Sequence, residues 1–199
     1  MDEPPFLRAL AYGSYESGLR ELIHLLKYEH VRPAAGVLGR MLAEVIQELA
    51  AEFNEALVVP VPLHASKLRQ RGFNQAEEIA KSAPKQLKTA RLQLAPAVLE
   101  RRRATETQTG LTRAQRLENI RGAFSVKQSE RLRERDVILV DDVFTTGTTV
   151  SECARVVRRA GASRVFVAMV ARVLKAEVTF AHVPEEFEPE QAMAVGAGM

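Results

Sequence analysis

Residues 137–149 read VILVDDVFTTGTT, and this stretch decides the fold. Its first four residues are apolar and predict a buried strand, which ends in Asp141 and Asp142. A short Thr/Gly-rich turn then leads into a segment that predicts a helix up to Arg159. Residues 164–173 (RVFVAMVARV) predict the next buried strand. Because this strand–helix–strand unit implies parallel strands, the sequence predicts an α/β fold with a mostly parallel central sheet flanked by helices.

The polar end of the first strand predicts a site for a sugar phosphate. Ligands bind at the carboxyl edge of open α/β sheets, where Asp141 and Asp142 would lie. The free amides of the turn and the positive helix end suit a phosphate monoester, and Gly147 lets the backbone approach it closely. Two carboxylates beside a phosphate repel it unless they meet ribose hydroxyls or Mg²⁺. We therefore predict a ribose 5-phosphate site, rather than a corner that only packs, with hydroxyl donors from Thr145, Thr146, Thr148 and Thr149.

A second candidate segment is residues 58–80, VVPVPLHASKLRQRGFNQAEEIA. It begins as a short buried strand that prolines end, continues as a polar basic stretch, and predicts a helix from Asn74. We expect the basic stretch to bind pyrophosphate, and the alternative is a solvated basic turn. His64 could donate to an anion, but we favour a loop or packing role for it. The candidate pyrophosphate-binding residues are Pro62, Leu63, His64, Lys67, Arg69 and Arg71.

A third segment, residues 99–124, predicts a flexible basic flap that closes over pyrophosphate and excludes water. Residues 100–116 have no apolar face, and the alternative is a disordered basic loop. A helical turn from Thr112 to about Ile120 and a short extended piece should follow. The candidate catalytic residues across these segments are Asp141, Asp142, Arg101 and Arg103.

The rest of the chain predicts three regions. Residues 1–55 form an N-terminal helical part, with helices over 15–29 and 33–53. Residues 56–175 form the core of the fold. Residues 176–199 carry five Glu and no Lys or Arg, and we expect an acidic tail that is disordered at its end.

Composition narrows the function classes. Cys153 is the single cysteine, so an internal disulfide or a zinc site built from several cysteines is excluded, and we expect it to be a small core residue. Neither a secretory signal nor a membrane-spanning stretch is evident, which predicts a soluble cytoplasmic protein without membrane insertion. Residues 67–121 hold thirteen Lys/Arg against five Asp/Glu, which indicates an anion-binding middle.

Three motifs together resemble the ComF family, bacterial competence-associated proteins with a phosphoribosyltransferase domain. They are PVPLH…RGFNQA, R.T.TQ.GL.R..R..N..GAF and VILVDDVFTTGTT, and the resemblance covers roughly residues 15–174. The last motif resembles the signature with which type I phosphoribosyltransferases bind 5-phosphoribosyl-1-pyrophosphate (PRPP). The resemblance implies the type I fold, with Asp141 and Asp142 on the ribose hydroxyls and Thr145–Thr149 on the 5-phosphate. Many family members also carry an N-terminal zinc ribbon with paired cysteines, which this sequence either lost or had trimmed.

Three functions follow as hypotheses. The first is transfer of phosphoribosyl from PRPP to an unknown acceptor, linked to DNA uptake, with Mg²⁺ bound through PRPP and with Asp141 and Asp142 as its candidate protein ligands. The second is a non-catalytic PRPP- or nucleotide-binding module. The third is single-stranded DNA binding, for which aromatic side chains within the basic stretch are few. The resemblance also suggests a competence helicase or recombination mediator as partner, and a homodimer is a further expectation. The candidate nucleic-acid-binding residues are Lys67, Arg71, Arg101, Arg102 and Arg103.

Overall fold

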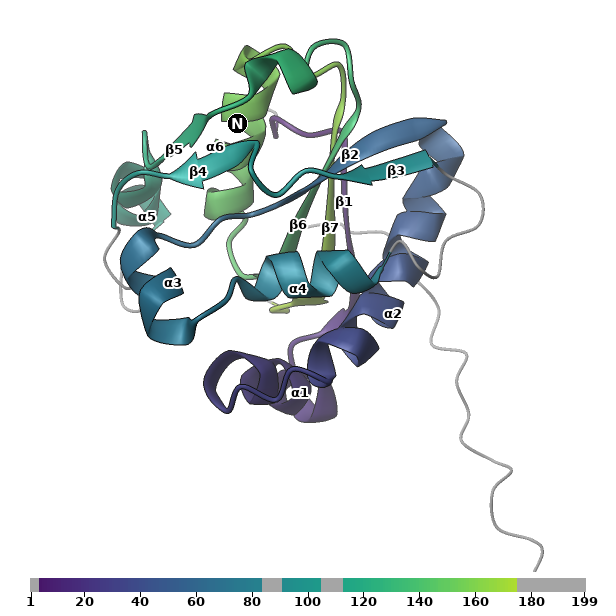
Figure 1. The fold of residues 1–199 in the computed structure, drawn as a ribbon, viewed down its shortest axis with the longest axis vertical. Coiled ribbons are helices and arrows are strands. Elements are labelled where there is room, and N and C mark those ends of the chain that lie inside the picture. The colour runs from purple at the N-terminus through teal and green to yellow at the C-terminus, as the bar shows by residue number, and fades with distance from the viewer. Residues whose placement is uncertain (1–3, 84–90, 105–112, 175–199) are drawn as a thin grey trace, which may run out of the picture.

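A five-stranded parallel sheet organises the computed structural model, which describes residues 4–83, 91–104 and 113–174 (Figure 1). The strand order is β1-β7-β6-β2-β3, and every pairing in it is parallel. The strands are β1 (Arg8–Ser14), β2 (Glu55–Pro60), β3 (Arg91–Leu94), β6 (Val137–Phe144) and β7 (Val165–Arg172). The predicted α/β architecture with a mostly parallel sheet is therefore confirmed.

Helices cover one face of the sheet, and a mixed layer covers the other (Figure 1). The first layer consists of α2 (Ala34–Leu49), α4 (Gln75–Ser82) and α1 (Ser17–Tyr28), which packs on α2. The second contains α6 (Thr148–Arg159), α5 (Arg113–Ile120) and the antiparallel pair of β4 (Leu99–Arg101) and β5 (Phe124–Val126). The short elements are α3 (Ala65–Arg71) and the 3₁₀ turns η1 (Ala50–Glu52) and η3 (Ser129–Arg131).

The central strand β6 is buried on both faces, which explains its continuous apolar sequence. Ile138 and Val140 pack into the core on the α2 side, while Val137 and Leu139 pack into the core on the α6 side. All four side chains are fully buried. Because the strand is held from both sides, the residues that follow Val140 emerge at a well-defined sheet edge.

The structure corrects three sequence expectations. Residues 8–14 form the edge strand β1, although we expected residues 1–55 to be helical, because Leu10 packs into one core and Ala9 into the other. The stretch 65–71 is a helix, which no apolar periodicity revealed because none of its residues is buried. Arg91–Leu94 adds an unpredicted strand at the opposite edge. The domain boundary at residue 55 stays a prediction, and the expected tail and the tip of the expected flap lie outside the described residues.

Helix α2 approaches α4 most closely at Gly39, which gives a test of this packing. A Cβ at Gly39 would lie 2.4 Å from the Cβ of Ser82 and 3.1 Å from the carbonyl oxygen of Ile79. We expect Gly39→Ala to lower the free energy of unfolding by about 1–3 kcal/mol through overpacking. Gly36→Ala is the matched control, since it meets nothing within 4 Å and should raise stability by up to about 1 kcal/mol. Urea unfolding of both variants measures the difference, and equal stability would contradict the close helix contact.

Candidate functional site

Two acidic side chains follow the buried stretch of β6 near the carboxyl edge of the sheet, and the strand continues past them to Phe144. Residues Val137–Val140 pair with Val165–Ala168 on one side and, over Leu57–Pro60, with β2 on the other. Asp141 is half-buried, whereas Asp142 retains only 4 % of its accessible surface. The carboxylate of Asp141 accepts a hydrogen bond from the backbone N–H of Asp142 at 2.9 Å. The predicted position of both acids at a sheet edge is therefore found in the structure.

The turn after β6 forms a tight entrance to α6. Gly147 is the N-cap residue of that helix and has a φ of +72°, which side chains disfavour. A Cβ at this position would lie 2.4 Å from Cζ of Phe144, so the turn also lacks room for one. The first intrahelical bond runs from Ser151 N–H to the carbonyl of Gly147 at 2.8 Å, and the amides before it precede the helical ladder. Such amides at a positive helix end can bind an anion.

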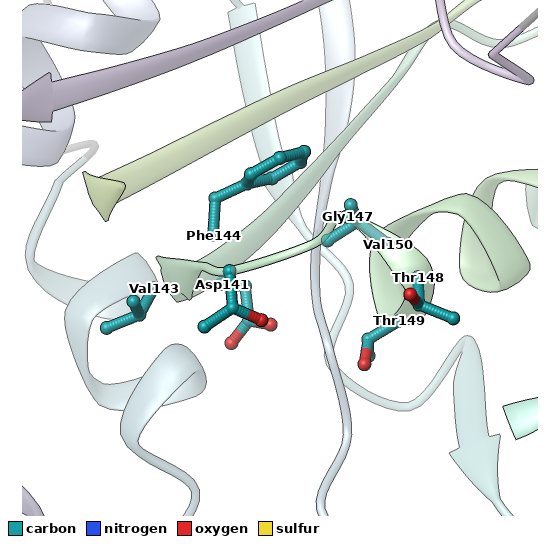
Figure 2. A pocket seen from close by; sticks show the side chains of 8 residues that line it. Asp141, Val143, Phe144, Gly147, Thr148, Thr149 and Val150 are labelled. Atoms are coloured by element: carbon teal, nitrogen blue, oxygen red, sulfur yellow. The ribbon is translucent and has the colours of Figure 1, made fainter. Parts of the chain in front are cut away.

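Asp141 and the turn line one pocket (Figure 2). Figure 2 shows Asp141 and Thr149 on the side of the turn that faces away from the ring of Phe144. The hydroxyls of Thr146 and Thr148 lie 2.8 Å apart, so they are linked to each other at the mouth of the turn. The hollow offers about 230 Å³ of space open to solvent. Its lining residues are Asp141, Val143, Phe144, Thr145, Gly147, Thr148, Thr149 and Val150.

The two carboxyls have opposite electrostatic environments. Burial raises the pKa of Asp141 well above its ordinary value, and the neighbouring charge of Asp142 raises it further. Burial alone would also raise the pKa of Asp142, but the charge and hydrogen bond of Lys27 outweigh it and lower that pKa. Lys27 Nζ forms a buried ion pair with Oδ2 of Asp142. The pKa of Lys27 is raised because this attraction exceeds the effect of its own burial.

Four cationic side chains gather beside the acids. The pKa of Lys67 is lowered, first by burial and then by the charges of Arg101, Arg71 and Lys27. Arg101 is half-buried, and burial lowers its pKa, while the nearby charge of Asp141 opposes that shift. Its backbone also bridges to His64, which brings β4 to the segment after β2. The structure therefore brings together three of the predicted anion-binding side chains from two segments of the chain, Lys67 and Arg71 from α3 and Arg101 from β4.

The remaining candidates from the sequence take other positions. Arg102 forms an ion pair with Glu100 at 2.8 Å, and Arg103 donates to the carbonyl of Asn119 at 2.8 Å. Arg69 lies exposed in the last turn of α3, and Pro62 and Leu63 are half-buried in the segment that precedes it. None of these contacts tests a role in binding, so the roles predicted for these five residues stay predictions.

His64 and Asn74 hold the segment between β2 and α4 in shape. The side chain of His64 accepts from Ser66 N–H at 3.3 Å and caps α3, which is the loop role we favoured for it. Asn74 caps α4 by accepting from Ala76 N–H at 3.1 Å, and it donates to the carbonyl of Val61 at 3.0 Å. The predicted helix start at Asn74 is thus explained by an N-cap.

Sequence reasoning missed Lys27 and did not select Gln75. Lys27 lies at the end of α1, and its role depends on the contact of its helix with a strand more than a hundred residues later. Gln75 is buried, and its Oε1 accepts from Arg71 at 2.5 Å. Gln75 also helps to lower the pKa of Asp142, after the larger effects of burial and of Lys27. The sole signal in the sequence was a polar residue at the first position of a predicted helix.

Cys153 and the possible metal ligands remain to be described. Cys153 is fully buried in the α6 core, and burial raises the pKa of its thiol, so the expected core role is confirmed. Among the described residues no group of three or more His, Cys, Asp or Glu side chains could hold a metal by itself. Carboxylate oxygens are the ligand type that Mg²⁺ prefers; Asp141 lines the pocket, whereas Asp142 is paired with Lys27. No helix within the described ranges is long and apolar enough to cross a membrane.

The chain is similar to known proteins in sequence and matches a known domain. The model of the phosphoribosyl transferase domain matches residues 26–182. DNA utilization protein YhgH of Escherichia coli K12 is 33% identical over 176 residues, covering 86% of this chain and 74% of that protein. Competence protein F of Haemophilus influenzae is 30% identical over 174 residues, covering 85% and 75%.

A solved structure of hypoxanthine phosphoribosyltransferase from Staphylococcus aureus covers 75% of this chain and 74% of its own, with 15% identity and a TM-score of 0.40. That likeness is too distant to support a functional argument. The domain match and the two relatives suffice: the chain has the type I phosphoribosyltransferase fold and belongs to the phosphoribosyltransferase family, in the ComF-type group that includes competence protein F and DNA utilization protein YhgH.

Proposed function

We propose that the protein binds PRPP with Mg²⁺ and transfers its phosphoribosyl group to an acceptor, with release of pyrophosphate. The observation that carries this proposal is the continuity of one pocket from Asp141 through Gly147 to Thr149, which joins a carboxylate to a helix entrance. A ribose 5-phosphate has hydroxyls for the first and an anion for the second. The family match supports the same ligand class.

In the proposed complex, Asp141 and Asp142 accept hydrogen bonds from the ribose hydroxyls, and the turn from Thr145 to Thr149 binds the 5-phosphate. Lys67, Arg71 and Arg101 then face the pyrophosphate. Mg²⁺ would supply charge neutralisation of the pyrophosphate oxygens, with the two carboxylates available on its protein side. As the C1–O bond of PRPP breaks, the gathered cations stabilise the departing negative charge electrostatically.

The names of the relatives support a role in handling incoming DNA. One is called a competence protein and another a DNA utilization protein. We propose that this chain serves the same process, and that its acceptor or its effector belongs to it. A PRPP-binding module without turnover is the alternative, and it differs in releasing no pyrophosphate with any acceptor.

A second candidate function is single-stranded DNA binding at the rim of the pocket. Aromatic side chains are few in the basic stretch. The fold nevertheless places two aromatic rings beside arginines from other segments. Arg71 lies 5.6 Å from the ring centre of Tyr28, and Arg32 lies 5.6 Å from that of Phe73. Tyr28 is 61% exposed. Phe73 is buried, so Tyr28 beside Arg71 is the aromatic face of the two that suits a stacked base and its phosphate.

Gly147→Ala tests the phosphate end of the pocket. We expect the affinity for PRPP with Mg²⁺ to fall roughly tenfold or more, because a Cβ would collide with Phe144 and move the turn. Gly161→Ala is the matched control, since Gly161 has a φ of +102°, meets no atom closer than 3.4 Å to its Cβ, and lies just past the other end of α6. It should lose about 1–2 kcal/mol of stability and keep its affinity. Calorimetry that registers no PRPP binding by the wild type would contradict the proposed function.

Asp141→Asn and Asp142→Asn should change stability in opposite directions. The folded protein disfavours the ionised form of Asp141, whose pKa is raised, so we expect Asp141→Asn to raise the thermal midpoint at neutral pH. Asp142→Asn leaves Lys27 buried without its counter-charge and should cost about 3 kcal/mol. Both variants should lose PRPP affinity in calorimetry. A lowered midpoint for Asp141→Asn would show that its charge is not disfavoured.

Tyr28→Ala tests the nucleic-acid rim. We expect weaker binding of a short single-stranded oligonucleotide, with a loss of roughly 1–3 kcal/mol if one base stacks on the ring. Fluorescence anisotropy should also show affinity falling steeply as salt rises. Leu7→Ala is the control, because Leu7 is equally exposed but lies beside Val165, at the opposite edge of the sheet. An oligonucleotide affinity that changes neither with salt nor on Tyr28→Ala would argue against this second function.

A further inference from the structure

Lys27 contacts Asp142 from helix α1, which lies outside the segments that line the pocket. It lies in the last turn of α1, and its side chain is 17% exposed against 5% for that of its partner, Asp142. Lys81 differs from Lys27 in burial. It also pairs with carboxylates, but it lies on the surface of α4, where its side chain is 47% exposed. A lysine that gives up most of its hydration requires a strong partner in return.

Asp142 is held from a second side by Gln75. Gln75 helps to lower the pKa of the Asp142 carboxyl, after the larger effects of burial and of Lys27, and its Oε1 accepts from Arg71 Nη1 at 2.5 Å. With Oε1 bound to Arg71, the NH₂ group is the end of the amide that remains to donate to a carboxylate. Lys27, Asp142, Gln75 and Arg71 therefore form one polar network that joins α1, β6, α4 and α3.

Stability alone is a poor explanation for this network. A buried ion pair gains little over a well-packed apolar pair, because desolvation offsets the attraction. What the network does provide is orientation. Asp141, by contrast, bonds within β6 to the N–H of Asp142, and its side chain lines the pocket.

We propose that Lys27 is a positioning residue which, with Gln75, holds the carboxylate of Asp142 in one orientation for a ribose hydroxyl. This inference rests on the proposed function, since it assigns how the ribose end of that site is kept in place. Lys27 acts through Asp142 and does not touch the ligand. Its loss therefore weakens every ligand that contains the ribose and leaves ligands without it unaffected.

A double-mutant cycle with two ligands tests the proposal. Lys27→Met, Asp142→Asn and the combined variant are titrated with PRPP plus Mg²⁺ and with ribose 5-phosphate. We expect Lys27→Met to weaken both ligands by the same factor, roughly tenfold to a hundredfold. In the Asp142→Asn background the same substitution should change affinity by less than about twofold to threefold. Lys81→Met is the control and should bind both ligands as the wild type does.

Thermal unfolding keeps the test independent of a failure to fold. Each single variant leaves one buried polar group unmatched, while the combined variant removes both charges, so it should be more stable than either single variant. Lys27→Met that weakens PRPP much more than ribose 5-phosphate would mean direct contact with pyrophosphate and overturn the proposal. An unaltered affinity would overturn it as well. Absence of binding by the wild type would instead contradict the proposed function.

Discussion

Adjacent carboxylates at the end of a buried strand repel each other, and the site depends on how the fold relieves that repulsion. Asp141 and Asp142 are consecutive, so the backbone holds them close whatever surrounds them. Lys27 pairs with Asp142 and keeps it ionised, whereas Asp141 retains an unfavourable environment that raises its pKa. Lys27 thus pairs with one oxygen of Asp142, and Asp141 lines the pocket, where a ligand can bind it.

The parallel sheet gives this pair its neighbours. Strands β2 and β6 run side by side, so the segments that follow them leave from one edge. The segment after β2 carries Lys67 and Arg71, and the turn after β6 enters α6. Cations and a helix entrance therefore lie on either side of the carboxylates, which is the order of groups that a phosphorylated sugar with a pyrophosphate would require.

Two features of the site oppose folding. Lys67 lies among other cations, and Asp141 is disfavoured as an anion. Each becomes favourable when an anionic, hydroxyl-bearing ligand binds the folded state alone. Their concentration at one sheet edge distinguishes this region from the two apolar cores, where the packing of β6 and β7 leaves no comparable conflict.

The sequence by itself determined the central strand, the twin acids and the turn into α6, because these features are local: apolar run, polar end and glycine follow one another within residues 137–149. It also located the basic segments that supply Lys67, Arg71 and Arg101. It missed β1 and β3, edge strands whose short runs acquire meaning only from their neighbours, and α3, which buries none of its residues. Only the tertiary structure decided that Lys27 pairs with Asp142 and that Gln75 joins Asp142 to Arg71, since those contacts depend on how helices pack across the sheet and leave no periodic signal in the chain.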